Sequence, residues 1–518
     1  MGWRKWIVRG IVYGIVAAAG GGALAYQRWT NPGAVREQII AELEKAFPGA
    51  EVSVDSARLR ILGGIQLNGL RLSRVDDPEK HEFLHVPTAI FYHDKEKILD
   101  GELRLRKIEL NRPRLRARRG KDGKWNIDGL IRPPGTLPER PLPAIVIHQG
   151  TLSIEDLAVP DRASVLEVND VNLTLINDPL LKVTLHGAAN SVLLGKLKLA
   201  GAIDRQTGET HLAFRAAQIP LTQDLAARLP FQCPHDLFVG LQLSATAHVE
   251  GKLSLHPKQP LYYEVGGEVV GAKLSHPKLL LPYEDLNLKF HCNNGELTLE
   301  SLTARSGKTE ISAHGVAQLP CIDQEFEVHV DCKHVVLGRE LAERLPSKLR
   351  DLHEMFQPDG PTTVHVACAR HEGEWVPLVD GSPSTVSLRP EGISLSFRNF
   401  PYPLKRATGA VDYNLHDARV KVDLTAYAGD RPIFVLGHWT GKDEHADVKF
   451  DIHGNDLAIN DELLNALPTQ PTNLQTFAAG FHATGKLDVN AHIRKEPGKE
   501  FRNEYHLYFH DVAARWDA

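Results

Sequence analysis

The sequence predicts a mainly β protein: an elongated, curled antiparallel sheet built from repeats, with short helices and an N-terminal transmembrane helix. From Glu51 onward, apolar and polar residues alternate with a period of two, as in "VSVDSARLRI" and "DVKFDIHG". Turns that contain Asn-Gly or Asp-Gly separate the alternating runs, which indicates hairpins rather than β/α units. A sequence repeat extends this pattern over most of the chain.

The composition excludes several classes of protein. Of 518 residues, 42% are hydrophobic and 24% are charged, so the chain is neither disordered nor a multi-span membrane protein. A formal net charge of -5 gives no reason to expect nucleic acid as a partner. The five cysteines form no C-x-x-C pair, which argues against a disulfide scaffold and a zinc ribbon.

Residues 1–30 predict a short cytoplasmic N-terminus and a transmembrane anchor. Arg4, Lys5 and Arg9 precede a charge-free run from Gly10 to Tyr26, which reaches the lower limit of ~17 residues for a spanning helix. The basic cluster places the N-terminus in the cytoplasm and everything after residue 30 outside it. A cleaved signal peptide is the alternative, because residues 23–25 form an A-x-A site.

An amphipathic helix is expected next. Asn31 and Pro32 suit the cap and the first position of a helix, and Pro48-Gly49 ends it. Apolar residues recur along one face at Val35, Ile39, Leu43 and Phe47. This helix opens an N-terminal module, residues 31–160, in which strands follow.

The remaining strands belong to a repeat with an offset of 122 residues. Ten identities share this offset, among them Gly307 with Gly429 and Leu345-Pro346 with Leu467-Pro468. We assign a divergent first unit to residues 161–260, a second to 261–383 and a third to 384–502. Each unit is expected to close with a short amphipathic helix before Leu-Pro, the first of them within residues 219–230. Residues 503–518 resemble the start of a further unit, which suggests a truncated repeat protein.

The segment "HEFLH" contains the spacing by which zinc proteases hold their metal. His81 and His85 would share one face of a helix, with Glu82 to activate a water. A helix is not supported at this position, because Asp77-Pro78 and Pro87 leave too few residues for one. In a strand the two imidazoles would lie about 13 Å apart, too far to hold one ion. A metalloprotease is therefore the remote alternative, and we expect neither a metal nor a cofactor.

Two other patterns are also interpreted as structural. "SGKTE" at residues 306–310 resembles the end of a phosphate-binding loop, but Leu302 stands where that loop needs a glycine. The next repeat carries Gly429-Asp430-Arg431 in the same place, so we predict a β-turn. Cys332 and Cys368 each follow a histidine by three residues, and alternation sends each pair to opposite faces of a strand.

The basic run "RPRLRARR" predicts a strand with one cationic face and one apolar face. Arg112, Arg114, Arg116 and Arg118 alternate with Pro113, Leu115 and Ala117. Anionic lipid head groups near the anchor would suit such a face. A solvated edge strand, charged against aggregation, is the plainer interpretation.

The N-terminal residues resemble the AsmA-like (AsmA/TamB-related) family of bacterial envelope proteins. The resemblance covers about residues 1–160 and is strongest at Arg112-Pro113-x-Leu115 followed by Asp122-Gly123-x-Trp125-Asn126. It implies a single-pass inner-membrane protein whose bulk is periplasmic. It further implies a long curled sheet with an inner apolar groove that carries phospholipid or lipopolysaccharide, or that assists outer-membrane assembly, and no catalytic residues.

These observations lead to a functional expectation that is not enzymatic. We expect passive lipid transfer along an apolar groove toward the outer membrane, with inner- or outer-membrane proteins as further partners. The alternative is a scaffold without cargo that assists outer-membrane protein assembly. The residues expected to form the groove wall are Leu279, Leu281, Ile311, Leu395, Phe397, Ile433 and Val435.

Overall fold

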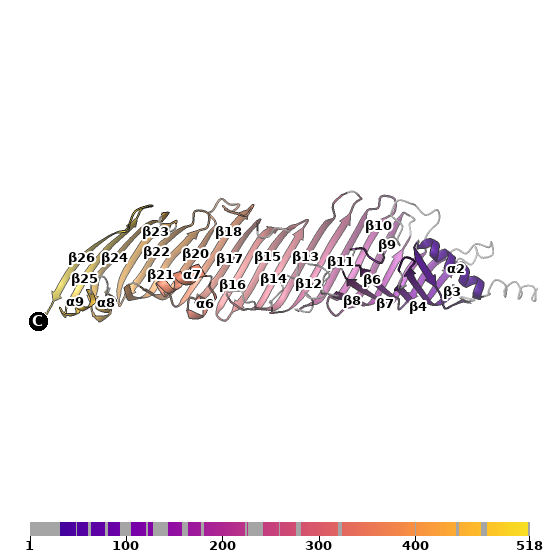
Figure 1. The fold of residues 1–518 in the computed structure, drawn as a ribbon, viewed down its shortest axis with the longest axis horizontal. Helices are drawn as coiled ribbons and strands as arrows, with labels where there is room; N and C mark the ends of the chain where they lie inside the picture. The colour runs from indigo at the N-terminus through magenta and orange to yellow at the C-terminus, as the bar shows by residue number, and fades with distance from the viewer. Residues whose placement is uncertain are drawn as a thin grey trace, which may run out of the picture. The chain divides into compact units, whose positions relative to one another are not determined.

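The computed structural model confirms a mainly β chain with a few short helices (Figure 1). It describes residues 32–47, 49–60, 64–77, 81–93, 105–120, 123–127, 143–157, 164–177, 181–222, 225, 242–257, 259–275, 281–319, 324–345, 347–398, 400–441, 445–467 and 474–515. The predicted anchor, residues 1–30, lies outside them. Within the described ranges, no helix has both the length and the apolar character needed to cross a membrane.

The chain divides into two compact units. Unit 1 comprises residues 1–239 and 246–265, and unit 2 comprises residues 240–245 and 266–518. The division falls within β12 (Gln242–Leu255) and β13 (Tyr262–Ser275).

Unit 1 begins with the predicted helix, α2 (Pro32–Ala46), followed by four strands. These are β1 (Ala50–Ser53), β2 (Ser56–Arg60), β3 (Gly64–Arg74) and β4 (Glu82–His93). β3 pairs in antiparallel fashion with the other three. The apolar stripe of α2 packs onto a closed core of strand residues, in which Leu67 and Val86 are 0% exposed. The members of this N-terminal core include Ile39, Val54, Ile65, Leu67, Leu72, Val86 and Phe91.

The basic run forms β6 (Arg114–Arg119), which continues the line of β5 (Leu105–Asn111). Both pair in parallel with β7 (Ala144–Asp156). Arg112 separates them with a left-handed backbone, φ 52°, and its N–H donates to the His148 carbonyl at 2.8 Å. After β7, four antiparallel strands follow: β8 (Ser164–Ile176), β9 (Lys182–Ser191), β10 (Gly195–Asp204) and β11 (Thr210–Leu221).

Unit 2 is an antiparallel ladder in which successive strands pair with one another, except that the described residues pair β20 with β18 rather than with β19. Its strands are β14 (Tyr283–Asn293), β15 (Glu296–Ser306), β16 (Thr309–Gln318), β17 (Phe326–Val336), β18 (Pro361–His371), β19 (Glu374–Val376), β20 (Thr385–Phe397), β21 (Phe400–Asn414), β22 (Arg419–Ala428), β23 (Arg431–Thr440), β24 (Asp447–Ile459), β25 (Thr484–Lys495) and β26 (Arg502–Ala513). β18 pairs with both β19 and β20.

The 122-residue offset reappears in the elements of unit 2. It relates β16 to β23, and it relates α6 (Arg339–Arg344) to α8 (Asp461–Ala466). The two predicted closing helices are thus confirmed, whereas most of residues 219–230 lies outside the described ranges. A second helix, which the sequence pattern did not predict, follows each of them: α7 (Ser347–Phe356) and α9 (Leu474–Ala479). Figure 1 shows these four helices at the same end of the strands.

Bulges recur along the strands, and side chains of the next strand satisfy them. A bulged residue leaves its N–H without a ladder partner, and a buried or half-buried N–H needs one. The N–H of Gln149, φ 52°, donates to the Asn172 side chain at 3.2 Å, and that of Gly271, φ 62°, donates to Asn287 at 3.0 Å. Asp456, φ 54°, donates to Asp488 at 2.7 Å in the same manner. These contacts, which we call bulge clamps, occur in both units.

Candidate functional site

The ladder of unit 2 has two chemically distinct faces. Strand register joins one residue from each strand into a row that crosses the sheet, and neighbouring rows alternate in polarity. The apolar row comprises Ala304, Ile311, Cys332, Val364, Leu388, Val411, Val422, Gly437, Phe450 and Ile493. The polar row, one residue away along each strand, comprises Thr303, Ser312, Asp331, His365, Ser387, Asp412, Lys421, His438, Lys449 and Arg494.

The apolar face is closed at one end of the strands and open toward the other. At the helix-bearing end, Ile433 is 7% exposed and packs in one cluster with Ala466 of α8. Phe356 of α7 lies 5.6 Å from Phe397, between ring centroids. The members of the apolar row other than Ala304 are only half-buried, so described protein atoms leave part of each accessible. Apolar side chains in this state favour a further apolar layer or ligand.

The structure places the seven expected wall residues in different environments. Leu279 lies outside the described residues, and Leu281 is half-buried in a bend before β14. Ile311 belongs to the half-open apolar row. Leu395 and Phe397 in β20, and Ile433 and Val435 in β23, lie at the helix-bearing end. Phe397 contacts α7, Ile433 and Val435 belong to the cluster that contains Ala466 of α8, and Leu395 packs with residues of neighbouring strands. Val411, Val422 and Phe450 of the apolar row were not among the expected wall residues.

Unit 1 contains an open hollow of about 620 Å³ over β7 to β11. Each strand contributes three consecutive residues, and the central ones are joined by register: Ile147, Leu173, Gly187, Leu199 and Phe214. Position 187 requires a glycine because the backbone of β8 lies close to it: a Cβ atom there would lie 2.7 Å from the Asn172 carbonyl oxygen. The hollow is thus centred on an apolar row of unit 1.

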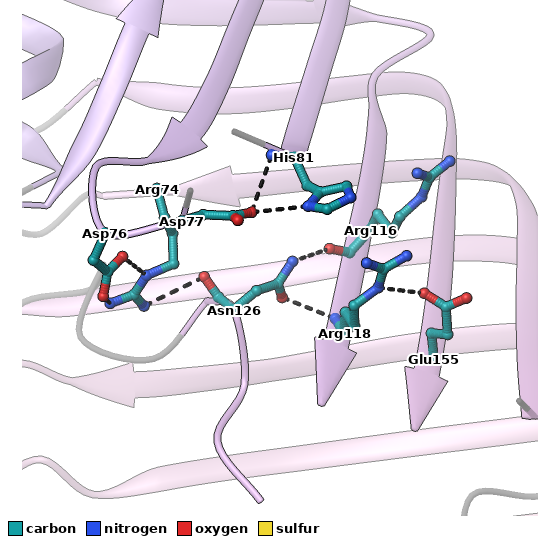
Figure 2. A network of polar contacts seen from close by, with 8 residues as sticks. All are labelled: Arg74, Asp76, Asp77, His81, Arg116, Arg118, Asn126 and Glu155. Carbon is teal, nitrogen blue, oxygen red and sulfur yellow. Dashed lines mark hydrogen bonds and ion pairs between the residues drawn. The ribbon is translucent and has the colours of Figure 1, made fainter. Parts of the chain in front are cut away.

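The four arginines of the basic run differ in their partners (Figure 2). Arg118 forms an ion pair with Glu155 at 2.6 Å. Arg114 and Arg116 are exposed on β6 and form no ion pair with another described residue, and Arg112 lies exposed in the left-handed turn before them. Leu115 packs against the N-terminal core, and Ala117 is buried. The expected alternation of a cationic and an apolar face is present along β6.

The Asn126 side chain forms hydrogen bonds with the backbone of β6, a contact that was not predicted from the sequence. Its side chain accepts a hydrogen bond from the Arg118 N–H at 2.8 Å and donates one to the Arg116 carbonyl at 2.9 Å (Figure 2). The amide thereby satisfies backbone groups at the edge of β6, as a paired strand would. Arg74 reaches the Asn126 carbonyl at 3.5 Å and also pairs with Asp76. The sequence feature that could have indicated this contact is the D-G-x-W-N pattern of residues 122–126.

The histidines of "HEFLH" lie at a strand, not on a helix. β4 begins at Glu82 and contains His85, which confirms the strand prediction. His81 contacts Asp77, with 3.0 Å between Nδ1 and the carboxylate, and His85 lies 3.6 Å from Glu82 (Figure 2 shows the first pair). No group of three potential metal ligands is found among the described residues.

The other two patterns also have structural roles. Gly307, φ 58°, forms the turn between β15 and β16, and Gly429, φ 59°, forms the equivalent turn between β22 and β23. Burial raises the pKa of the Cys332 thiol, with a smaller contribution from the Asp331 charge, and burial raises the pKa of Cys368. A raised thiol pKa disfavours the reactive thiolate.

Comparison with known proteins adds no assignment. No family model matches the chain, and no curated protein or solved structure matches it. The function is therefore inferred from the geometry of the apolar and polar faces of unit 2.

Proposed function

We propose that this protein is a membrane-anchored envelope protein that transfers phospholipid, or another lipid, passively along an apolar groove of its curled sheet. The observation that carries this proposal is the half-open apolar row of unit 2, which crosses ten strands in register. A soluble protein seldom leaves a contiguous apolar surface of that kind without a ligand or partner.

In this mechanism the sheet acts as a solvent for acyl chains. The apolar row removes the tails from water, and the polar row on the opposite face keeps the sheet hydrated. Because this transfer is passive, its direction comes from partners at either end. The hollow over Gly187 in unit 1 offers a second apolar surface of the same kind.

The exposed arginines support a position next to an anionic membrane. Arg114 and Arg116 have no ion-pair partner within the described ranges, and such guanidinium groups attract phosphate head groups at about 1 kcal/mol per cation near an anionic surface. Together with the predicted anchor at residues 1–30 and the AsmA-like resemblance, they favour a bacterial inner-membrane protein with a periplasmic bulk.

Adjacent positions on one strand test the proposal. We would place a photo-crosslinking amino acid at Val422, in the apolar row, or at Lys421, in the polar row, and irradiate cells that express the full chain. Mass spectrometry should find phospholipid attached at Val422 and none at Lys421. Equal labelling at both positions, or no lipid at either, would refute lipid transfer along this face.

A scaffold without cargo is the second candidate, because a partner protein can also cover the half-open apolar row of unit 2. Protein crosslinks at Val422, with no lipid at that position, would favour this function over lipid transfer.

A further inference from the structure

A second cross-strand row marks the end of the apolar face that lies opposite the helices of unit 2. Register joins Tyr413, Val420, Trp439, Val448 and Lys495 into what we call the rim row. Each member lies within one residue of a strand terminus. Two residues farther into the strands lies the apolar row, with Val411, Val422 and Phe450.

The chemistry of the rim row differs from that of the rows below it. Tyr413 is 37% exposed, and Trp439 is half-buried. The Lys495 ammonium lies over the Phe501 ring, 5.4 Å from its centroid. A lysine and two aromatic residues that carry polar groups thus alternate with valines. Tyr and Trp favour membrane–water interfaces, where one part of the side chain is apolar and another is hydrated.

The distance from the rim row to the helix-packed core is long enough to hold the acyl chains of one lipid monolayer. From Trp439 to Ile433 is six residues of β23, or about 20 Å at ~3.3 Å per residue. One leaflet of a bilayer has a hydrocarbon depth of roughly 15 Å, half of the ~30 Å core. Acyl tails that start at the rim row would therefore end near the residues that α8 covers.

Trp439 also has an unsatisfied polar group. Its indole Nε1 is buried and has no hydrogen-bond partner among the described residues. An unsatisfied buried donor is costly, and native structures usually provide an acceptor. The ester carbonyl of a glycerolipid would lie at this depth, between the head group and the tails, and it can accept this hydrogen bond once the indole ring turns its covered Nε1 toward the groove.

We propose that the rim row is the head-group site of the lipid groove. Lys495 binds the lipid phosphate, Trp439 turns its indole N–H outward to donate to an acyl ester, and the tails extend over the apolar row toward the helices. This inference rests on the proposed function, because it names the part of the same face that selects the cargo. The ligand class is accordingly a glycerophospholipid with its phosphate at the strand termini opposite α6 to α9.

Two variants and one control test the site. Lys495→Gln removes the cation, Trp439→Phe removes the donor, and Lys449→Gln removes a lysine from the polar row on the opposite face. The delipidated full chain would be titrated with radiolabelled phosphatidylglycerol and with diacylglycerol, both in non-ionic detergent. Glycerol phosphate, which lacks tails, would be tested as a competitor. Circular dichroism and thermal unfolding would establish that each variant is folded.

We expect Lys495→Gln to weaken phosphatidylglycerol binding by about fivefold and to leave diacylglycerol binding unchanged. Trp439→Phe should weaken both lipids, because both contain acyl esters, and Lys449→Gln should weaken neither. Equal binding of phosphatidylglycerol by wild type and Lys495→Gln would overturn the head-group site while leaving lipid transfer intact. Competition by glycerol phosphate alone would indicate a free-phosphate site and overturn it too. Failure of the wild type to bind either lipid would refute the proposed function itself.

Discussion

The N-terminal core of unit 1 and the apolar face of unit 2 are both built from strands that alternate apolar and polar residues. They differ in how completely other side chains cover the apolar residues. In the N-terminal core, α2 packs in one cluster with residues of β1 to β4, and Leu67, Val86 and Phe91 are at most 2% exposed. In unit 2, the short helices cover only one end of the strands, and the apolar row beyond them is half-buried. One apolar face is complete in itself, and the other is available to a ligand.

This difference shows where the stability of each region resides. A closed core obtains its free energy from side chains removed from water by other side chains. An open face obtains less from its own packing, and its ladder hydrogen bonds and helix-packed clusters must hold the strands. Substitutions of one residue type should therefore have unequal effects in the two regions.

The largest expected effect is that of Phe91→Ala in the N-terminal core. Phe91 is 2% exposed, so its removal should leave a cavity and lower the free energy of unfolding of unit 1 by about 3–5 kcal/mol. Phe450→Ala, in the half-open apolar row, should cost less than about 2 kcal/mol. Urea unfolding followed separately in the two units would measure both. A cost for Phe450→Ala as large as that for Phe91→Ala would mean that the apolar face is closed.

The charged faces of the two regions should differ as well, and this effect ranks second. Arg114 and Arg116 have no ion-pair partner among the described residues, so the double alanine variant should weaken binding to vesicles containing phosphatidylglycerol by about 2 kcal/mol, ~1 for each cation. Arg118→Ala should have a smaller effect, because Glu155 already compensates its charge. Replacement of Lys421 and Lys449 on unit 2 is the matched control. Sedimentation with vesicles measures the wild type and the three variants, and an equal loss of binding in the lysine control would show that β6 has no special role.

The sequence predicted the ladder better than the site. Alternation and turns are local, so the β class, α2 and the helices α6 and α8 could all be predicted from residues near one another. Which apolar residues remain open depends on α7 and on how Phe356 reaches Phe397, a contact between segments distant in the chain. Leu395, Phe397, Ile433 and Val435 were chosen as wall residues because they are apolar and alternate. The half-open rows could be separated from helix-packed ones only after register and helix placement were known.

The bulge clamps were missed for a related reason. Asn172 and Asn287 each follow a left-handed aspartate by two residues, as D-V-N and D-L-N. This spacing is too short to be distinctive in sequence. Its meaning arises only when the neighbouring strand presents an N–H that lacks a ladder partner.

Removal of a bulge clamp should lower the free energy of unfolding by the same amount in both regions, which provides a third comparison. Asn172→Ala in unit 1 removes hydrogen bonds to Gln149 and Asp170, and Asn287→Ala in unit 2 removes those to Gly271 and Asp285. Each should lower the free energy of unfolding by about 1 kcal/mol, because water replaces part of the lost bonding. Urea unfolding of each unit provides the measurement. If the two substitutions lower the free energy of unfolding by similar amounts, the difference in stability between the regions comes from their apolar faces. A much larger loss in one unit would instead locate the difference in the strand ladder.

The smallest expected effect concerns a carboxylate on the polar face of unit 2. Hydrogen bonds from Arg494, and then from His492, hold the pKa of Asp451 below its ordinary value. A carboxyl whose pKa is lower in the folded state stabilises the fold above its unfolded pKa of ~3.9, and this contribution is lost as the pH falls through the folded pKa. Because Asp451 is 41% exposed, screening limits the effect of Asp451→Asn at pH 7 to about a few tenths of a kcal/mol.

The pH dependence of this variant distinguishes charge from hydrogen bonding. The difference between wild type and Asp451→Asn should begin to shrink as the pH falls below ~4 and should vanish below the lowered folded pKa of Asp451, where its carboxyl is protonated. Asp423→Asn, on the same face of β22, is the matched control and should show a smaller difference at neutral pH. Thermal unfolding at pH 7 and pH 3 measures both. If the Asp451→Asn difference persists undiminished at pH 3, the carboxylate charge contributes nothing to the polar face, and the effect of the substitution comes from the hydrogen bonds to Arg494 and His492.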